Sequence, residues 1–158
     1  SFKVGKEDKR LKMRFILGFL IMASTIFGFD ASIFPKTENG EKQVILTLKP
    51  LENEDEYLVK VFFGKEMMLD CNAHSFMGLN LERKILQGYG YEYFKLSGRD
   101  DISSTMMLCS EPKKLRFLSF DPNFIVRYNS NYPLVFYVPI DFSVKYEVFK
   151  KVESKILN

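Results

Sequence analysis

Apolar and polar residues alternate with a period of two through much of the chain beyond residue 40, as expected for strands that bury one face. The alternation is clear in five segments, 43–49 (QVILTLK), 57–63 (YLVKVFF), 91–96 (YEYFKL), 134–138 (LVFYV) and 144–149 (VKYEVF). A further strand is expected to begin near Leu115. The intervening sequences ENGEK, ENEDE, GYGY, SGRDD, DPN and YNSNYP are typical of turns. Because no long segment with helical periodicity separates the strands, the pattern predicts an all-β fold: a single antiparallel β-barrel or sandwich-like domain with long surface loops. The charged tail, KKVESKILN, is expected to form a short helix or a mobile arm.

The N-terminal region has a different pattern. Several basic residues lead into fifteen uncharged and mostly apolar positions from Phe15 to Phe29, a run shorter than the roughly 20 residues of a membrane-spanning helix. We interpret residues 13–31 as a secretory signal peptide cleaved near Ala31, with an N-terminal anchor or a buried helix as the alternative. Residues 1–12 precede Met13 and are interpreted as an upstream extension or residues added by cloning. The remaining residues, 32–158, are expected to form one domain.

The formal net charge of +3 arises in that N-terminal region, because residues 32–158 contain 17 basic and 17 acidic side chains. This balance gives no indication of a nucleic-acid partner. The signal peptide predicts export without stable insertion in a membrane.

The chain has two cysteines, Cys71 and Cys109. In an exported protein we expect them to form a disulfide, the alternative being two buried free thiols in a reducing cell. Closing the intervening segment would stabilise the fold by roughly 3 to 4 kcal/mol in the loop-closure model. The single histidine, His74, is expected to lie in a loop or the core rather than to bind a metal, and the sequence indicates no cofactor.

Known catalytic motifs are absent from the sequence: it contains no G-x-S-x-G, P-loop, H-E-x-x-H or glycine-rich dinucleotide turn. The pair Asp100 and Asp101 follows Ser97 and Gly98, where acidic residues usually serve to solvate a loop. We therefore interpret the chain as an exported binding module rather than an enzyme. A degenerate secreted enzyme is a weaker alternative.

The segment SGRDDISSTMMLC, residues 97–109, places Met106 and Met107 in a small polar run just before Cys109. It lies between a strand that ends near Leu96 and another that begins near Leu115, so it is expected to be a tethered loop. Methionines in a loop often fill a corner of the core. Small polar residues followed by a flexible apolar side chain are also what the binding groove of a protease accepts from an extended peptide.

Five segments resemble the ecotin family of periplasmic serine-protease inhibitors: DCNAH (70–74), LQGYGYEYF (86–94), SSTMMLC (103–109), VRYNSNYPLVFYVP (126–139) and VKYEVFK (144–150). The similarity runs in order from about Ile33 to Lys150. It implies a periplasmic inhibitor of chymotrypsin-fold serine proteases of the trypsin, chymotrypsin or elastase type. The implied reactive bond joins Met106 and Met107, and the implied reactive loop comprises Ser103, Ser104, Thr105, Met106, Met107 and Leu108.

The resemblance further implies a homodimer that exchanges C-terminal strands, here FSVKYEVFK. Each protease would then contact the reactive loop of one subunit and a secondary patch on the other, formed by Tyr89, Gly90, Tyr91, Glu92, Arg127, Asn129, Ser130, Asn131 and Tyr132. Two residues depart from the family pattern and bear on the target range: Tyr89 stands where the family has Trp, and Leu108 replaces a smaller residue.

An alternative from another class is an exported β-barrel that binds a small apolar ligand, with Met67, Met68 and Met77 lining its cavity. The two interpretations differ in one observable. The barrel predicts that Met106 and Met107 point inward, whereas the inhibitor predicts that they face solvent.

Overall fold

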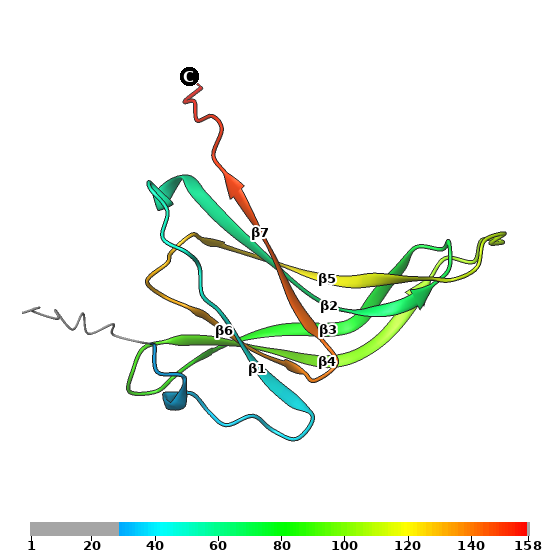
Figure 1. Cartoon of the computed structure of the whole chain (residues 1–158), viewed down its shortest axis with the longest axis horizontal. Helices are drawn as coiled ribbons and strands as arrows, with labels where there is room; N and C mark the ends of the chain where they lie inside the picture. The colour runs from blue at the N-terminus through cyan, green and yellow to red at the C-terminus, as the bar shows by residue number, and fades with distance from the viewer. Residues whose placement is uncertain (1–28, 158) are drawn as a thin grey trace, which may run out of the picture.

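The computed structural model describes residues 29–157 as a two-layer β-structure with no α-helix among them (Figure 1). Two short 3₁₀ turns, η1 (Ala31–Ile33) and η2 (Glu54–Glu56), accompany the strands. The strands are β1 (Glu41–Leu46), β2 (Tyr57–Leu69), β3 (His74–Ile85), β4 (Glu92–Ser104), β5 (Lys114–Arg127), β6 (Leu134–Pro139) and β7 (Ser143–Lys150).

The strands form two sheets, one in the order β1-β6-β4-β3 and the other in the order β5-β2-β7. They pack face to face as a sandwich and do not close into a barrel, so the sandwich alternative of the sequence analysis is confirmed. All pairings are antiparallel except the short parallel contact of β4 with β6 at Phe94 and Lys95. The predicted antiparallel domain therefore includes one short parallel contact.

Phenylalanine fills the space between the sheets. Phe63 on β2, Phe136 on β6 and Phe142 after β6 are fully buried, together with Val59 and Val61. The rings of Phe63 and Phe136 are 5.4 Å apart. Burying one such side chain contributes roughly 1.5 to 3 kcal/mol to folding. This filled interior does not match the ligand cavity that the barrel alternative required.

Strand β6 is buried on both faces. Phe136 and Val138 face the space between the sheets, whereas Val135 and Tyr137 face outward and are covered by Phe34, which follows η1. The hydroxyl of Tyr137 donates a hydrogen bond to the carbonyl of Pro35 at 2.5 Å. This second, smaller core explains the uninterrupted apolar sequence of residues 134–138.

Two sequences expected to form turns are bulges within long strands. In β4 the register shifts so that Met77 pairs with Asp101 and Leu79 with Gly98. The SGRDD sequence therefore continues the strand, and Gly98 has a φ of 99° at a point where a Cβ atom would lie 2.0 Å from a β3 carbonyl oxygen. In β5 the DPN sequence likewise lies opposite a register shift between Val61 and Phe63.

Strand β3 was not predicted at all, because its apolar positions alternate weakly and its outer face is charged. The five segments that were predicted correspond to β1, β2, β4, β6 and β7, and the strand expected near Leu115 is β5. Residues 151–157 have no regular structure and are exposed, so the short helix expected for the tail is wrong.

A charged cluster connects the two sheets. Lys65 of β2 donates hydrogen bonds to Asp100 of β4 and to Asp141, which lies between β6 and β7, both at 2.6 Å. These hydrogen bonds raise the pKa of Lys65, and the one from Lys65 lowers the pKa of Asp100.

The predicted extension and nearly all of the predicted signal peptide lie outside the described residues. Of the signal peptide the structure describes only Phe29, Asp30 and Ala31; the ring of Phe29 lies 5.5 Å from that of Phe34. Within residues 29–157 no helix is long and apolar enough to span a membrane.

Candidate functional site

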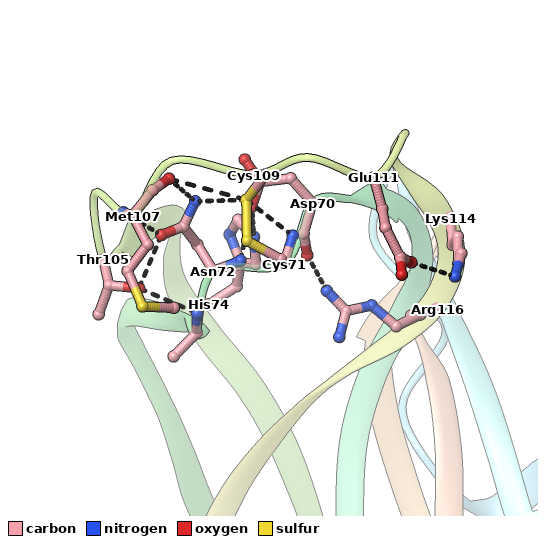
Figure 2. Close-up of a disulfide and its surroundings, with 11 residues drawn as sticks. Asp70, Cys71, Asn72, His74, Thr105, Met107, Cys109, Glu111, Lys114 and Arg116 are labelled. Atoms are coloured by element: carbon pink, nitrogen blue, oxygen red, sulfur yellow. Dashed lines mark hydrogen bonds and ion pairs between the residues drawn. A yellow bond between two sulfur atoms is a disulfide. The ribbon is translucent and has the colours of Figure 1, made fainter.

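The segment that connects β4 to β5 lies at one end of the molecule, beside the turn that connects β2 to β3 (Figures 1 and 2). A disulfide between Cys71 of that turn and Cys109 joins the two segments, with the two Cα atoms 5.7 Å apart. The predicted pairing is therefore present. It fixes the loop on the C-terminal side of the Met106–Met107 bond.

Asn72 holds the loop on both sides of Met106. Its side-chain oxygen accepts hydrogen bonds from the Thr105 hydroxyl at 2.9 Å and from the Met107 amide at 2.6 Å. Its side-chain nitrogen donates to the Met107 carbonyl at 3.3 Å. Asn72 is 7% exposed, so these bonds are shielded from water, and Figure 2 shows its amide group between Thr105 and Met107.

Asp70 stabilises the turn between β2 and β3, which contains Asn72. Its carboxylate accepts hydrogen bonds from the Asn72 amide and from His74 Nε2, each at 2.9 Å. Both hydrogen bonds lower the pKa of the Asp70 carboxyl group, and the one from the Asn72 backbone amide has the larger effect. Arg116 of β5 donates to the Asp70 carbonyl. His74, the first residue of β3, thus orients the Asp70 carboxylate. Among residues 29–157 no cluster of three or more His, Cys, Asp or Glu side chains is placed to hold a metal.

The side chains above this support face solvent. Met106 is 98% exposed, Met107 59% and Leu108 102%. Such exposure is costly for apolar side chains that serve no partner. It is the orientation that the inhibitor interpretation predicts and the opposite of the one that the barrel alternative predicts. Met68 and Met77 are also more than half exposed, so neither lines an interior cavity.

The three residues before Met106 lie partly in a strand. Ser103 and Ser104 end β4 and pair with Ser75 and His74 of β3, and the Thr105 amide donates to the Ala73 carbonyl at 3.1 Å. In the described residues the pairing of β4 with β6 covers only Phe94 and Lys95. Among the strands of residues 29–157, none pairs with this edge of β4 at Ser103 and Ser104.

The turn between β3 and β4 lies at the other end of the same strands. The Leu86 amide donates to the Tyr91 carbonyl at 2.7 Å, and the Gly90 amide donates to the Leu86 carbonyl at 3.1 Å. Gly88 and Gly90 have φ angles of 85° and 71°, a backbone conformation that favours glycine. Since β4 has 13 residues, about 40 Å of strand separates this turn from the Met106 loop.

A groove of about 920 Å³ lies beside this turn. Six of the nine residues predicted for the secondary patch line it: Tyr89, Gly90, Tyr91, Glu92, Asn131 and Tyr132. The other three lie in the same region but do not line it. Arg127 ends β5, Asn129 accepts a hydrogen bond from the Asn131 amide at 2.9 Å, and the Ser130 amide donates to Glu54 at 3.1 Å.

Two parts of these sites are not predictable from the sequence. Asn72 lies within the DCNAH motif, but nothing in the sequence indicates that its amide reaches Thr105 and Met107. The wall of the groove formed by Phe29, Ile33 and Phe34 is the second part. These residues are separated from Tyr91 by more than 50 positions, and their apolar character was the only available signal.

Comparisons with known proteins point to one family. The family model described as Ecotin matches residues 30–151. The chain is 37% identical over 124 residues to the protein named Ecotin from Serratia proteamaculans (strain 568), covering 77% of this chain and 72% of the relative. It is 34% identical over 125 residues to the Ecotin of Yersinia pestis (strain Pestoides F), covering 77% and 73%.

Ecotin-family proteins are serine-protease inhibitors, not enzymes. The family model spans both the loop at Met106 and the groove at Tyr91. On the evidence of this match and of the two relatives, the chain belongs to the ecotin family.

Proposed function

We propose that the protein inhibits chymotrypsin-fold serine proteases by presenting the loop Ser103–Leu108 as a substrate, with Met106 in the specificity pocket and the Met106–Met107 bond over the catalytic serine. The observation that carries the proposal is a fully exposed Met106 on a backbone held on both sides by Asn72.

The Asn72 hydrogen bonds and the disulfide explain why such a loop inhibits a protease rather than being cleaved and released as a substrate. A loop already fixed by Asn72 and the disulfide loses little conformational entropy on binding. After cleavage, the new N-terminus at Met107 would stay attached through Asn72 and through Cys109 two residues later. Held close to the acyl-enzyme, it can attack and re-form the bond instead of diffusing away.

Methionine at position 106 favours breadth of target. Its side chain is unbranched, uncharged and flexible, so it fits apolar pockets of different depths. The unpaired edge of β4 at Ser103 and Ser104 offers backbone groups for a strand-like contact with the enzyme. We therefore infer trypsin-, chymotrypsin- and elastase-like proteases as partners.

Charge substitutions at Met106 test the assignment. Met106→Asp is expected to raise the inhibition constant for chymotrypsin at least roughly thirtyfold, a loss of about 2 kcal/mol. Met106→Arg is expected to shift preference toward trypsin, whose pocket carries a buried negative charge. Met77→Asp, at a half-exposed methionine on β3, serves as the matched control. If both Met106 variants inhibit every protease as the parent does, the reactive-loop assignment is wrong.

We further propose that the active form is a homodimer that exchanges β7. Val59 and Val61 of β2 are fully buried, and they pair with Val148 and Tyr146 of β7. Directly paired residues share a face, yet Tyr146 is 47% and Val148 44% exposed. Tyr146 and Val148 thus form an exposed part of an otherwise buried face, and a second copy of the chain could cover it. Exchange of a terminal strand is a low-cost route to such a dimer.

Dimerisation would make inhibition bivalent. The reactive loop and the groove at Tyr91 lie at opposite ends of β4 (Figure 1), so one protease would contact the loop of one subunit and the groove of the other. The gain in affinity could reach about 10² to 10⁴.

Light scattering of the parent with an inactivated protease should then show two inhibitors and two enzymes per particle. Truncation before Val144, or the milder Tyr146→Asp, is expected to give a monomer with weaker inhibition. A parent that remains one-to-one at micromolar concentration would rule out bivalence but not the reactive loop.

We also propose that the protein is exported to the periplasm, with its signal peptide cleaved near Ala31. The disulfide supports this location, since such bonds persist in oxidising compartments. Mass measurement of the protein from a periplasmic extract is expected to give an N-terminus close to Ala31. Recovery of the protein with its N-terminal region intact in the cytoplasmic fraction would contradict the proposal.

A further inference from the structure

Leu108 is a fully exposed apolar side chain on a fixed backbone. It is 102% exposed, yet both of its neighbours are held: the Met107 carbonyl accepts a hydrogen bond from Asn72 at 3.3 Å, and Cys109 is bonded to Cys71. A leucine at a free loop tip would sample many directions. Here the backbone on each side restricts the position from which the side chain projects.

The loop residues differ in how they are held and in how far their side chains protrude. The Thr105 hydroxyl and the Met107 amide both reach Asn72, and Met107 is only 59% exposed, whereas Met106 and Leu108 are close to fully exposed. Met106 and Leu108 are therefore the most exposed of these three neighbouring apolar side chains, and both are available to a protein that binds the loop.

Three charged groups near the loop are engaged within the protein. Glu111 and Lys114 form an ion pair at 2.5 Å, and Asp70 accepts hydrogen bonds from Asn72 and His74. Leu108 itself offers an exposed apolar side chain to a partner.

We propose that Leu108 is a second specificity-determining residue, which enters the protease subsite two positions beyond the cleaved bond and selects enzymes in which that subsite is apolar. The inference rests on the proposed function, because it takes Met106 as the residue in the specificity pocket. Since the backbone at Met107 and Cys109 is already ordered, burial of Leu108 is offset by little further entropy loss.

The test uses the full chain with Met106 unchanged and chymotrypsin as the probe. Leu108→Ala is expected to raise the inhibition constant about tenfold and Leu108→Asp about a hundredfold, chiefly through faster dissociation. Leu108→Met, which keeps the apolar volume, is expected to stay within about threefold of the parent. Leu115→Ala, at an exposed leucine on β5, is the matched control and is expected to leave the constant unchanged.

Thermal unfolding and thiol titration of each variant establish that the fold and the disulfide are intact. If Leu108→Ala and Leu108→Asp inhibit as the parent does while Met106→Asp is weak, the inference about Leu108 is wrong and the reactive loop stands. If Met106→Asp also inhibits as the parent does, the proposed function itself is wrong. Equal losses with Leu108→Asp and Leu108→Met would likewise overturn the apolar-subsite assignment.

Discussion

Replacing Asn72 with alanine removes four side-chain hydrogen bonds, one of them to Cys109 Sγ at 3.3 Å. The three that hold the reactive loop join the Asn72 side chain to the Thr105 hydroxyl, the Met107 amide and the Met107 carbonyl, at 2.9, 2.6 and 3.3 Å. The disulfide remains and keeps the loop near its turn, but the residues on either side of Met106 are no longer fixed. Asn72→Ala therefore tests whether order in the loop, rather than the sequence around Met106, produces inhibition.

The expected magnitude follows from the bonds removed. A net contribution of roughly 0.5 to 1.5 kcal/mol for each gives about 1.5 to 4.5 kcal/mol for the three. In the variant, water can enter the space left by the Asn72 side chain and replace part of this energy, because the neighbouring residues Met106 and Leu108 are exposed. We expect about 2 kcal/mol to be lost from binding, or roughly thirtyfold in the inhibition constant.

Two measurements with chymotrypsin check the prediction: the inhibition constant, and the rate at which the Met106–Met107 bond is cleaved during long incubation. Asn72→Ala is expected to bind more weakly and to be cleaved faster, because a loosened leaving segment is religated less often. Asn80→Ala, an exposed asparagine on β3, is the control. An Asn72→Ala variant that inhibits within about threefold of the parent and resists cleavage equally well would refute this account of the loop.

Three further predictions concern stability and the groove. Replacing Cys71 and Cys109 together with alanine is expected to lower the free energy of unfolding by about 3 to 4 kcal/mol, measured with urea; equal midpoints for variant and parent would contradict it. Asp100 has a lowered pKa because Lys65 donates a hydrogen bond to it, so the stability it contributes is present above the ordinary aspartate pKa and is lost as pH falls through the folded-state value. The difference in unfolding free energy between the parent and Asp100→Asn should therefore shrink as pH is lowered from 7 to below 4, and a constant difference would argue against the pairing. Phe34→Ala removes a side chain that is 6% exposed and is expected to lower the free energy of unfolding by about 3 kcal/mol. It is also expected to weaken protease binding at the groove more than binding at the reactive loop, and an unchanged melting temperature would be inconsistent with the packing of Phe34.

The local pattern of the chain was enough to predict most of the strands. Alternation of apolar and polar residues is a property of neighbouring positions, so it indicated β2, β4, β6 and β7 before any partner strand was known. It could not show where a strand continues through a bulge. Gly98 in β4 and Asn123 in β5 are residue types that favour turns. Only the register with the neighbouring strand decides that they form bulges rather than turns.

The candidate site divides in the same way. The SSTMMLC motif and the cysteine count were sufficient to predict a tethered segment at Met106 and the disulfide, because residue types and the chemistry of an exported chain are local properties. The predicted start of the loop was wrong, since residues 97–104 belong to β4. The residues that hold the loop and the groove in place could not be predicted from the sequence. Asn72 reaches residues 33 and 35 positions away, and the ring of Phe34 lies 6.4 Å from that of Tyr91, which is more than 50 positions away in the chain. Such contacts depend on which strands become neighbours, and that is decided when the two sheets bury their phenylalanines against each other, not by any segment alone.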